Sequence, residues 1–487
     1  MTLLGRLKKI WPILLTISIY LLIFLYQIYP YGDYDWGWHF RYGEYFVKTG
    51  HVLLKDPFSS TLPGYVWTND SWLYDPILYL VQTKSGFTGL SILSGLIACF
   101  IFLISTVRYK LGYLKLGILA FFFIKISQGP LLGSLRAQSF GLLLLSVLMF
   151  LLMQSKEKVK TLYFLPLLFL FCANLHGTLT FGLLVIAMFL VSDLVNKNVS
   201  HFVLLLKMTV FSATLSFVNP FTYAAHLEAL NHFSNSMLSS YITEWQPVAF
   251  CSSCNLPYVF YFWAFVAALF IIRRKLSDLS YILLLSFLAV EAFLHRRYLS
   301  MFIVAAIPIV ASTVTEIKVK FEKSFTTLLA ATCIAVFLLL QGLFVRLPRF
   351  NLPTYSLNDY CRFTSHCTGG LTDYLLKNPL QGRGLNFYDW GGYLIGIGVK
   401  FPLFIDGRMP TWNKNGYYPL VDYGAMYYEH NIALFTSYHF NWVIARVDAP
   451  ILTDIRSDPT LLSQWNVVYA DDDAVCLVRK EIPAQDF

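Results

Sequence analysis

The sequence predicts an α-helical polytopic membrane protein with about eleven spans and a small C-terminal α/β domain outside the membrane. Hydrophobic residues make up 56% of the 487 residues and charged residues only 13%, whereas soluble domains carry about 25% charged residues. Long apolar runs recur as far as residue 346 and are missing from the rest of the chain. Together these observations exclude a soluble protein with a single anchor.

The first apolar run extends from about Trp11 to Tyr29 and follows a basic N-terminus. It has no small-residue cleavage site and is too long for a signal-peptide core, so we expect an uncleaved span. Further apolar runs lie at about 87–106, 111–126, 138–153, 161–173, 177–195, 202–218, 257–272, 279–294, 298–314 and 325–346. They lack the two-residue period of barrel strands, and backbone groups must be paired in lipid, so we predict helices.

Lys and Arg gather in alternate connections between these runs, which sets the orientation. The basic connections are predicted to be cytoplasmic, together with the N-terminus, in a cytoplasmic (inner) membrane. This places loops 31–86 and 219–256 on the outer side. The net charge of +9 is therefore mainly a topology signal and indicates no nucleic-acid partner.

Two domains are predicted: a membrane domain over 1–346 and an extracytoplasmic α/β domain over 347–487. The second contains the strand-like runs "NWVIAR" and "AVCLVR". An oxidising outer compartment makes disulfides Cys251–Cys254 and Cys361–Cys367 plausible. A redox or metal site at Cys251 and Cys254 stays open as an alternative.

Asp33 and Asp35 form an Asp-x-Asp pair where the chain leaves the first span, among Tyr34, Trp36 and Trp38. A carboxylate here can deprotonate an acceptor hydroxyl, and the pair could hold a divalent metal such as Mg²⁺ or Mn²⁺. Burial beneath the aromatic rings would raise the carboxylate pKa toward working pH. Solvated acids beside an interfacial aromatic belt are the alternative.

Cations at the outer ends of later spans form a second group of candidates. In "FLHRRYLS", His295, Arg296 and Arg297 oppose the positive-inside trend, and guanidinium groups match phosphate, so we predict an anionic lipid partner. Ordinary headgroup contact is the alternative. Glu244 could supply a second carboxylate or be a plain loop acid. His176, in "NLHG", could be a ligand or satisfy backbone groups at a helix break.

The run from Asp33 to Tyr79 resembles the first periplasmic loop of bacterial GT-C fold glycosyltransferase-like membrane proteins. The similarity rests on Asp35, Trp38-His39, Gly43-Glu44, Asp56-Pro57-Phe58-Ser59 and Trp72-Leu73. "NLHG" at 174–177, "NPF" at 219–221, "EW" at 244–245, the outer Arg pair and "YDWGGYLI…PLFIDGR" at 388–408 are similar too. This chain departs from the pattern at Gly37, where a Trp is usual, and in the extra acid Asp33.

The resemblance implies an inverting transferase that moves a sugar from a polyprenyl-phosphate donor to an outer-face lipid, glycan or protein acceptor. It makes Asp35 the general base, with Asp33 as its rival and as its partner if a metal binds. No cofactor is implied with certainty. The residues assigned to substrate binding are Arg296, Arg297, His295, His39, Glu244, Asp56, His176 and Trp72. In the tail, Asp406 and Arg408 either shape an acceptor site or form a structural pair, with Gly391, Gly392 and Gly407 as turn glycines.

Two other function classes are alternatives to a sugar transferase. A glycolipid transporter or flippase would carry ionisable residues deep within its spans and an inverted repeat, and neither is clear in the sequence. A non-catalytic scaffold that binds lipid or a partner would keep the same motifs without turnover. Both alternatives keep membrane lipids as partners.

Overall fold

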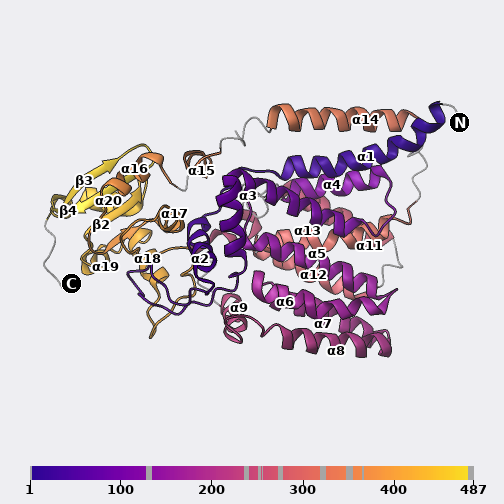
Figure 1. Cartoon of the computed structure of the whole chain (residues 1–487), viewed down its shortest axis with the longest axis horizontal. Coiled ribbons are helices and arrows are strands. Elements are labelled where there is room, and N and C mark those ends of the chain that lie inside the picture. Colours follow the sequence, from indigo (N-terminus) through magenta and orange to yellow (C-terminus); the bar gives the residue numbers. More distant parts are fainter. Residues whose placement is uncertain are drawn as a thin grey trace. The chain divides into compact units, whose positions relative to one another are not determined.

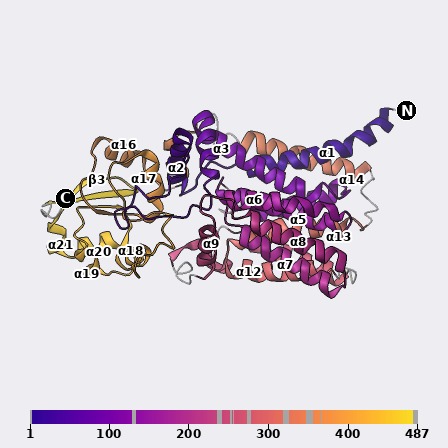
Figure 2. The same cartoon turned by 60° about the horizontal axis from the view of Figure 1, so that its bottom comes forward.

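The computed structural model describes residues 3–127, 134–234, 241–250, 254, 256–272, 278–317, 325–346, 355–364 and 367–480. The chain divides into two compact units (Figures 1 and 2). Unit 1 comprises Met1–Tyr31, Thr88–Leu230 and Ile242–Thr354, and unit 2 comprises Gly32–Phe87, Asn231–Tyr241 and Tyr355–Phe487. Each unit is therefore assembled from separate stretches of chain, and each is described by itself.

Unit 1 is built from apolar helices. Its helices are α1 (Leu3–Gln27), the later part of α3 (Tyr74–Thr106), α4 (Tyr113–Ser127), α5 (Ala137–Ser155), the short η1 (Val159–Phe164) leading into α6 (Leu165–Leu175), α7 (Leu179–Val195), α8 (Val199–Leu215), the first part of α9 (Ala224–Ser234), α11 (Leu256–Ile272), α12 (Leu279–Leu294), α13 (Tyr298–Val314) and α14 (Phe325–Leu340) with the π-helical turn η4 (Gln341–Arg346). Every apolar run noted in the sequence overlaps a helix, which confirms the predicted helical state.

Nearly every side chain of α13 is buried, and this helix packs against α4, α5 and α12. Outer helices instead expose large apolar side chains, such as Val210 on α8 and Phe337 on α14. Bare apolar surface of this kind is unfavourable in water and suits contact with lipid. The burial pattern is that of a helical bundle in a membrane.

Four helical segments within the described residues are long and apolar enough to cross a membrane: Ile10–Gln27, Tyr74–Thr106, Ala137–Ser155 and Thr326–Phe344. Shorter apolar helices cover Val159–Leu175, Thr180–Val195, Val199–Leu215, Leu256–Leu269, Leu279–Leu294 and Tyr298–Val314. Helices of about 20 residues match a bilayer core, and shorter ones need local thinning or flanking polar residues. The count of eleven spans stays a prediction.

Unit 2 combines a small sheet with short helices. Its helices are α2 (Trp36–Thr49), the first turns of α3, α15 (Leu357–Thr364), α16 (Gly369–Lys377), η7 (Tyr388–Trp390), α17 (Gly391–Ile397), α18 (Pro419–Tyr427), α19 (Ile432–Ser437), α20 (Pro450–Ser457) and α21 (Pro459–Ser463). Its strands are β1 (Gly384–Asn386), β2 (Trp442–Arg446), β3 (Trp465–Ala470) and β4 (Ala474–Arg479). The runs predicted as strands are β2 and β4.

The sheet has the strand order β1-β2-β4-β3, with β1 parallel to β2 and the other pairs antiparallel. Trp442, Val443, Ile444 and Ala445 of β2 are all buried, as expected for a central strand covered on both faces. The parallel β1–β2 pair needs a crossover, which α17, α18 and α19 supply.

The first loop belongs to this same unit and is hydrogen-bonded to the tail. The amide of Ser60 donates to the carbonyl of Leu403 at 2.7 Å, and the amide of Leu403 donates to Phe58 at 2.8 Å. Helix α2 also packs closely on α17. A Cβ placed on Gly37 would lie 1.8 Å from the carbonyl oxygen of Gly392, so only glycine fits there. Gly392 therefore lies in a helix contact, not in the turn that the sequence suggested.

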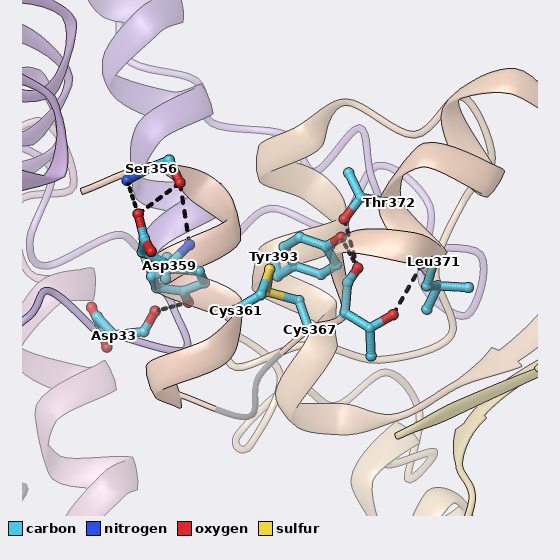
Figure 3. Close-up of a disulfide and its surroundings, with 10 residues drawn as sticks. Asp33, Ser356, Asp359, Cys361, Cys367, Leu371, Thr372 and Tyr393 are labelled. Carbon is cyan, nitrogen blue, oxygen red and sulfur yellow. Dashed lines mark hydrogen bonds between the residues drawn. A yellow bond between two sulfur atoms is a disulfide. The ribbon is translucent and has the colours of Figure 1, made fainter. Parts of the chain in front are cut away.

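A disulfide joins Cys361 of α15 to Cys367, just before α16 (Figure 3). It confirms one of the two predicted pairings; the other involves Cys251, which lies outside the described residues. Tyr360, next to Cys361, donates its hydroxyl to the backbone carbonyl of Asp33 at 2.6 Å. The crosslink therefore holds the helix that contacts the start of the first loop.

Replacing Cys361 and Cys367 together with serine should destabilise unit 2 by about 2 kcal/mol, because the crosslink closes only a short loop of the unfolded chain. The measurement is thermal unfolding of the purified protein, followed by tryptophan fluorescence. Cys333→Ser, at an exposed free cysteine, is the control. An unchanged melting temperature for the double variant, or upon adding reductant to the wild type, would contradict a stabilising role.

Candidate active site and anion site

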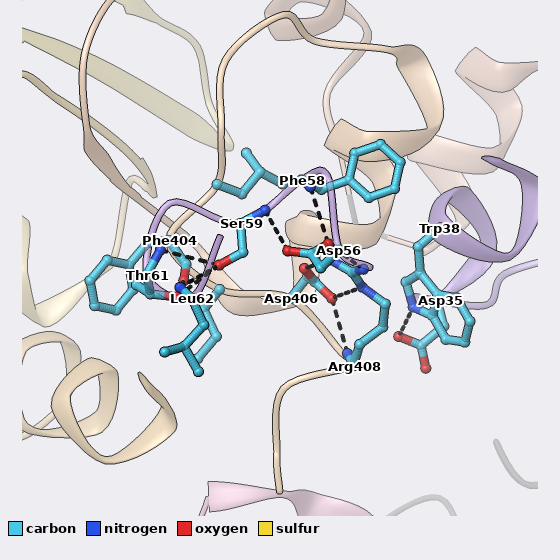
Figure 4. A network of polar contacts seen from close by, with 12 residues as sticks. Asp35, Trp38, Asp56, Phe58, Ser59, Thr61, Leu62, Phe404, Asp406 and Arg408 are labelled. Atoms are coloured by element: carbon cyan, nitrogen blue, oxygen red, sulfur yellow. Dashed lines mark hydrogen bonds and ion pairs between the residues drawn. The ribbon is translucent and has the colours of Figure 1, made fainter. Parts of the chain in front are cut away.

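Asp35 immediately precedes α2 and is half-buried. The indole nitrogen of Trp38, one turn later, donates to Oδ1 of Asp35 at 3.0 Å (Figure 4). The same carboxylate lies against the backbone at Gly407 of the tail, where an added Cβ would lie 1.8 Å from Oδ1. The carboxylate therefore occupies a defined position between two segments of unit 2.

Asp33 is more deeply buried than Asp35, with only 1% of its surface exposed. Its backbone carbonyl accepts the hydrogen bond from Tyr360. Burial raises the pKa of Tyr360 well above its usual value, and the charges of Asp33 and Asp35 raise it further, so the phenol stays a donor. Of the two acids, Asp35 is the more accessible.

A metal at this pair has little support in the described part of the chain. No group of three or more His, Cys, Asp or Glu side chains that could hold an ion occurs among the described residues. Divalent cations with oxygen ligands usually take several protein carboxylates or carbonyls. We therefore derive no step through a metal.

Arg408 forms a fully buried ion cluster with two carboxylates, one from each part of unit 2 (Figure 4). Its Nη1 donates to Asp56 of the first loop at 2.7 Å, and its Nε and Nη2 donate to Asp406 at 2.7 Å each. The Tyr42 hydroxyl accepts from Nη1 at 2.9 Å. Burial alone would lower the pKa of Arg408, but the charge of Asp406 and the other partners hold it well above its usual value.

Both carboxylate oxygens of Asp56 accept hydrogen bonds within this cluster and the adjoining turn. Its Oδ1 also accepts from the amide of Phe58 at 3.1 Å, and its Oδ2 accepts from the amide of Ser59 at 2.8 Å. Its side chain has no exposed surface. Asp56, which the resemblance assigned to substrate binding, thus holds Arg408 and a tight turn. Asp406 and Arg408 form the structural pair that the sequence favoured.

His39 and Trp72 also lie in the first loop of unit 2. His39 is buried and packs against Trp38 with tilted rings whose centroids lie 3.5 Å apart, and its Nδ1 lies 2.5 Å from Oδ1 of Asp75. Asn69 donates to the other oxygen of Asp75 at 2.7 Å. Trp72 packs on Phe46. These contacts shape the loop around Asp35.

Unit 1 gathers three guanidinium groups around one carboxylate. Glu244, in the turn Thr243–Trp245, forms an ion pair with Arg136, which precedes α5. Burial raises the pKa of Glu244, but Arg136, Arg297 and Arg296 outweigh it and lower the pKa below its usual value. Glu244 is therefore ionised at neutral pH. Among the described residues these three cations outnumber Glu244, and Glu291, beside His295, is a further carboxylate nearby.

The backbone and side chains around Glu244 hold both Arg296 and Arg297 in place. The amides of Arg296 and Arg297 donate to the carbonyls of Gln246 and Glu244 at 3.0 and 3.1 Å. The Nη2 of Arg296 donates to the Gln246 side chain at 2.9 Å, while its buried Nε has no hydrogen-bond partner among the described residues. The guanidinium of Arg297 lies 4.3 Å from the ring centre of Trp245, a favourable cation–π contact.

The two histidines predicted in this region take different positions. His295 lies 3.1 Å from Oε2 of Glu291 and edge-on to Trp245, beside the arginines. His176 lies at the end of α6, where its Nδ1 would be 2.9 Å from a Cβ added at Gly141 of α5. His176 therefore packs against the start of α5, the helix that Arg136 precedes.

The predicted residues thus divide between the units. Asp33, Asp35, His39, Asp56 and Trp72 belong to unit 2, and His176, Glu244, His295, Arg296 and Arg297 belong to unit 1. Sequence reasoning missed Arg136, although the predicted topology puts it on the same side as Arg296, where it opposes the positive-inside trend equally clearly. It also missed Gln246, for which the sequence offered no signal beyond its place beside Glu244.

No protein-family model and no curated protein sequence matches the chain. Among solved structures, the archaeal oligosaccharyltransferase AglB from Archaeoglobus fulgidus, in complex with an inhibitory peptide and a dolichol-phosphate, matches 91% of this chain and 70% of its own, with a TM-score of 0.57 and 12% identity. The apo form of the Archaeoglobus fulgidus oligosaccharyltransferase matches over the same shares, with a TM-score of 0.51 and 12% identity.

The chain has a GT-C fold. At 12% identity the likeness establishes the arrangement of helices and the appended domain and no more. It covers 91% of the chain. The GT-C resemblance that the sequence motifs suggested is thereby confirmed at the level of the fold.

Replacing Arg408 with methionine should destabilise unit 2 of this GT-C fold by about 3–5 kcal/mol, because two buried carboxylates lose their cation. The control is Arg446→Met, which breaks a pair with Asp448 at the same two-residue spacing but with side chains 41% and 65% exposed. Breaking an exposed pair should cost less than about 1 kcal/mol. Thermal unfolding of both variants measures the difference, and equal losses would contradict the structural role of the buried cluster.

Proposed function

We propose that this protein is an integral membrane glycosyltransferase that moves a sugar from a polyprenyl-phosphate donor to an acceptor on the outer face of the cytoplasmic membrane. The observation that carries the proposal is the excess positive charge of Arg136, Arg296 and Arg297 around Glu244 in a bundle of apolar helices. A lipid tail needs the apolar helices, and a phosphate needs the cations. The GT-C fold, shared with a structure that contains a dolichol-phosphate, supports it.

The arginines are suited to a phosphate for electrostatic reasons. Glu244 forms an ion pair with Arg136, and the buried Nε of Arg296 is a donor for which the described residues offer no acceptor. A buried donor left unsatisfied costs about 1–3 kcal/mol, which a phosphate oxygen would recover. Charge-assisted hydrogen bonds from guanidinium to phosphate are among the strongest in proteins.

Asp35 is the proposed general base. Its carboxylate takes a proton from the acceptor while the acceptor atom attacks the anomeric carbon of the sugar. The bond from that carbon to the phosphate oxygen breaks, and its electron pair leaves with the phosphate. Attack opposite the leaving phosphate inverts the anomeric configuration. The Trp38 indole holds the carboxylate by its hydrogen bond to Oδ1.

The proposed topology follows from the distribution of Lys and Arg in the connections. It has a cytoplasmic N-terminus and places the first loop, the loop at 219–256 and the tail outside. The acceptor is then a lipid, a glycan or a protein segment of the cell envelope. The inhibitory peptide bound to AglB is consistent with a binding site for an extended acceptor in this fold.

Asp35→Asn should lower sugar transfer by at least about 100-fold, because it removes the base and keeps the side-chain shape. Membranes that contain the protein are supplied with a panel of undecaprenyl-phosphate-linked hexoses and pentoses, and released undecaprenyl phosphate is measured. Asp70→Asn, in the same loop but outside the proposed site, is the control. An active Asp35→Asn protein would show that another group is the base.

The combined change of Arg296 and Arg297 to glutamine should weaken binding of undecaprenyl phosphate by roughly 10- to 100-fold, the loss expected for one or two charged hydrogen bonds. Binding is measured by native mass spectrometry of the purified protein. Arg108→Gln, which breaks a pair with Glu157 at the other end of α5, is the control. Equal affinity in all three proteins would rule out the phosphate site, while binding without turnover on any donor would favour the scaffold alternative.

A further inference from the structure

The tail segment Asp406–Arg408 lies directly against the carboxylate of Asp35. The three atoms nearest to a Cβ built on Gly407 all belong to Asp35: Oδ1 at 1.8 Å, Cγ at 2.9 Å and Oδ2 at 3.4 Å. Real Cβ atoms do not approach other heavy atoms this closely. Any side chain at Gly407 must therefore displace the Asp35 carboxylate.

Gly407 is required for space and not for backbone conformation. Among the described residues, the glycines with positive φ are Gly50, Gly64, Gly86, Gly382, Gly398 and Gly416, and Gly407 is not one of them. An alanine could adopt its backbone angles without strain. The effect of a substitution would therefore report the contact with Asp35 alone.

The backbone around Gly407 is held firmly on both sides. Before it, the Asn386 amide donates to the carbonyl of Ile405 at 2.8 Å, and its oxygen accepts from the amide of Phe404 at 2.8 Å. After it, the amide and guanidinium of Arg408 both donate to Asp406, within the buried ion cluster. The segment cannot retreat to make room for a larger residue at modest cost.

The backbone of Asp35 is equally confined. A Cβ added at Gly392 would lie 2.1 Å from the carbonyl oxygen of Tyr34 and 3.2 Å from the Cα of Asp35. Helix α2, which starts after Asp35, is locked on α17 through Gly37. The side chain of Asp35 is therefore the part that would move if Gly407 gained a Cβ.

We propose that Gly407, fixed by the buried cluster of Arg408, Asp406 and Asp56, is a positioning residue that sets the place of the Asp35 carboxylate. The inference rests on the proposed role of Asp35 as base. In this proposal the C-terminal tail takes part in catalysis only by positioning the base, because it provides the surface against which the Asp35 carboxylate lies. Misplacing a catalytic group by about 1 Å can cost roughly 100-fold in rate.

A double-mutant cycle that measures melting temperatures tests the contact without an activity assay. Gly407→Ala should lower the melting temperature of the purified protein, whereas the same change in an Asp35→Ala background should lower it much less, because the obstructing carboxylate is gone. Gly117→Ala, where the nearest atom to an added Cβ is 3.8 Å away, controls for the general effect of alanine. Equal losses in both backgrounds would overturn the inference. If the single variant does not accumulate, recovery in the double variant still reports the contact.

Turnover then tests the consequence. With the donor panel described above, Gly407→Ala should lower kcat by roughly 10- to 100-fold, while KM for the donor stays within about two-fold, since donor binding is untouched. A variant with wild-type kcat, or one whose loss is wholly in KM, would overturn the positioning role even if Asp35→Asn is inactive. An active Asp35→Asn protein would instead refute the base assignment itself, and with it this inference.

Discussion

The ion cluster of Arg408 with Asp56 and Asp406 is the interaction on which the second unit depends. Removing three charges from water is costly, and mutual attraction offsets that cost only when every donor and acceptor is satisfied. Here the guanidinium donates to both carboxylates and to Tyr42, and backbone amides supply the remaining donors to Asp56. The bond between Arg408 and Asp56 joins residues 352 positions apart. The cluster thus ties the first loop to the tail in one geometry and leaves little freedom for any other.

The arginine cluster of unit 1 also combines arginines with a carboxylate, but there the cations outnumber the anion, whereas around Arg408 the carboxylates outnumber the cation. Around Arg408, two carboxylates meet one cation and the side chains are fully buried. Around Glu244, three guanidiniums meet one carboxylate, whose side chain keeps 28% of its surface exposed. A closed cluster with its partners satisfied serves the fold, whereas a partly open cluster with surplus charge is suited to an anionic ligand. The balance of charge and exposure, more than the presence of arginine, separates the two roles.

The sequence predicted what depends on local pattern. Apolar runs predicted the helices of unit 1, alternating and continuous apolar runs predicted β2 and β4, and the outer cysteines predicted the Cys361–Cys367 bond. Hydropathy does not report which distant segments meet. That the first loop packs with the tail depends on close approach at Gly37 and Gly392 and on the pairing of Asp56 with Arg408. Gly391, Gly392 and Gly407 were predicted as turn residues because glycine most often serves turns. Gly407 does lie in a turn, whereas Gly391 and Gly392 lie in α17. Gly392 and Gly407 also make space for another backbone or side chain.

The long-range pairings together fix one thing, which is the position of the Asp35 carboxylate against Gly407. The position of Asp35 depends on α2, which packs closely against α17. The position of Gly407 depends on the neighbouring Arg408, which forms an ion pair with Asp56. Both constraints join the beginning of the chain to its last third, so the surroundings of the carboxylate are complete only when both ends have folded together. A first loop without the tail would keep the acid but lose the surface that holds it. The position of the acid is thus a property of unit 2 as a whole, and for that reason the motif around Asp35 alone could not reveal it.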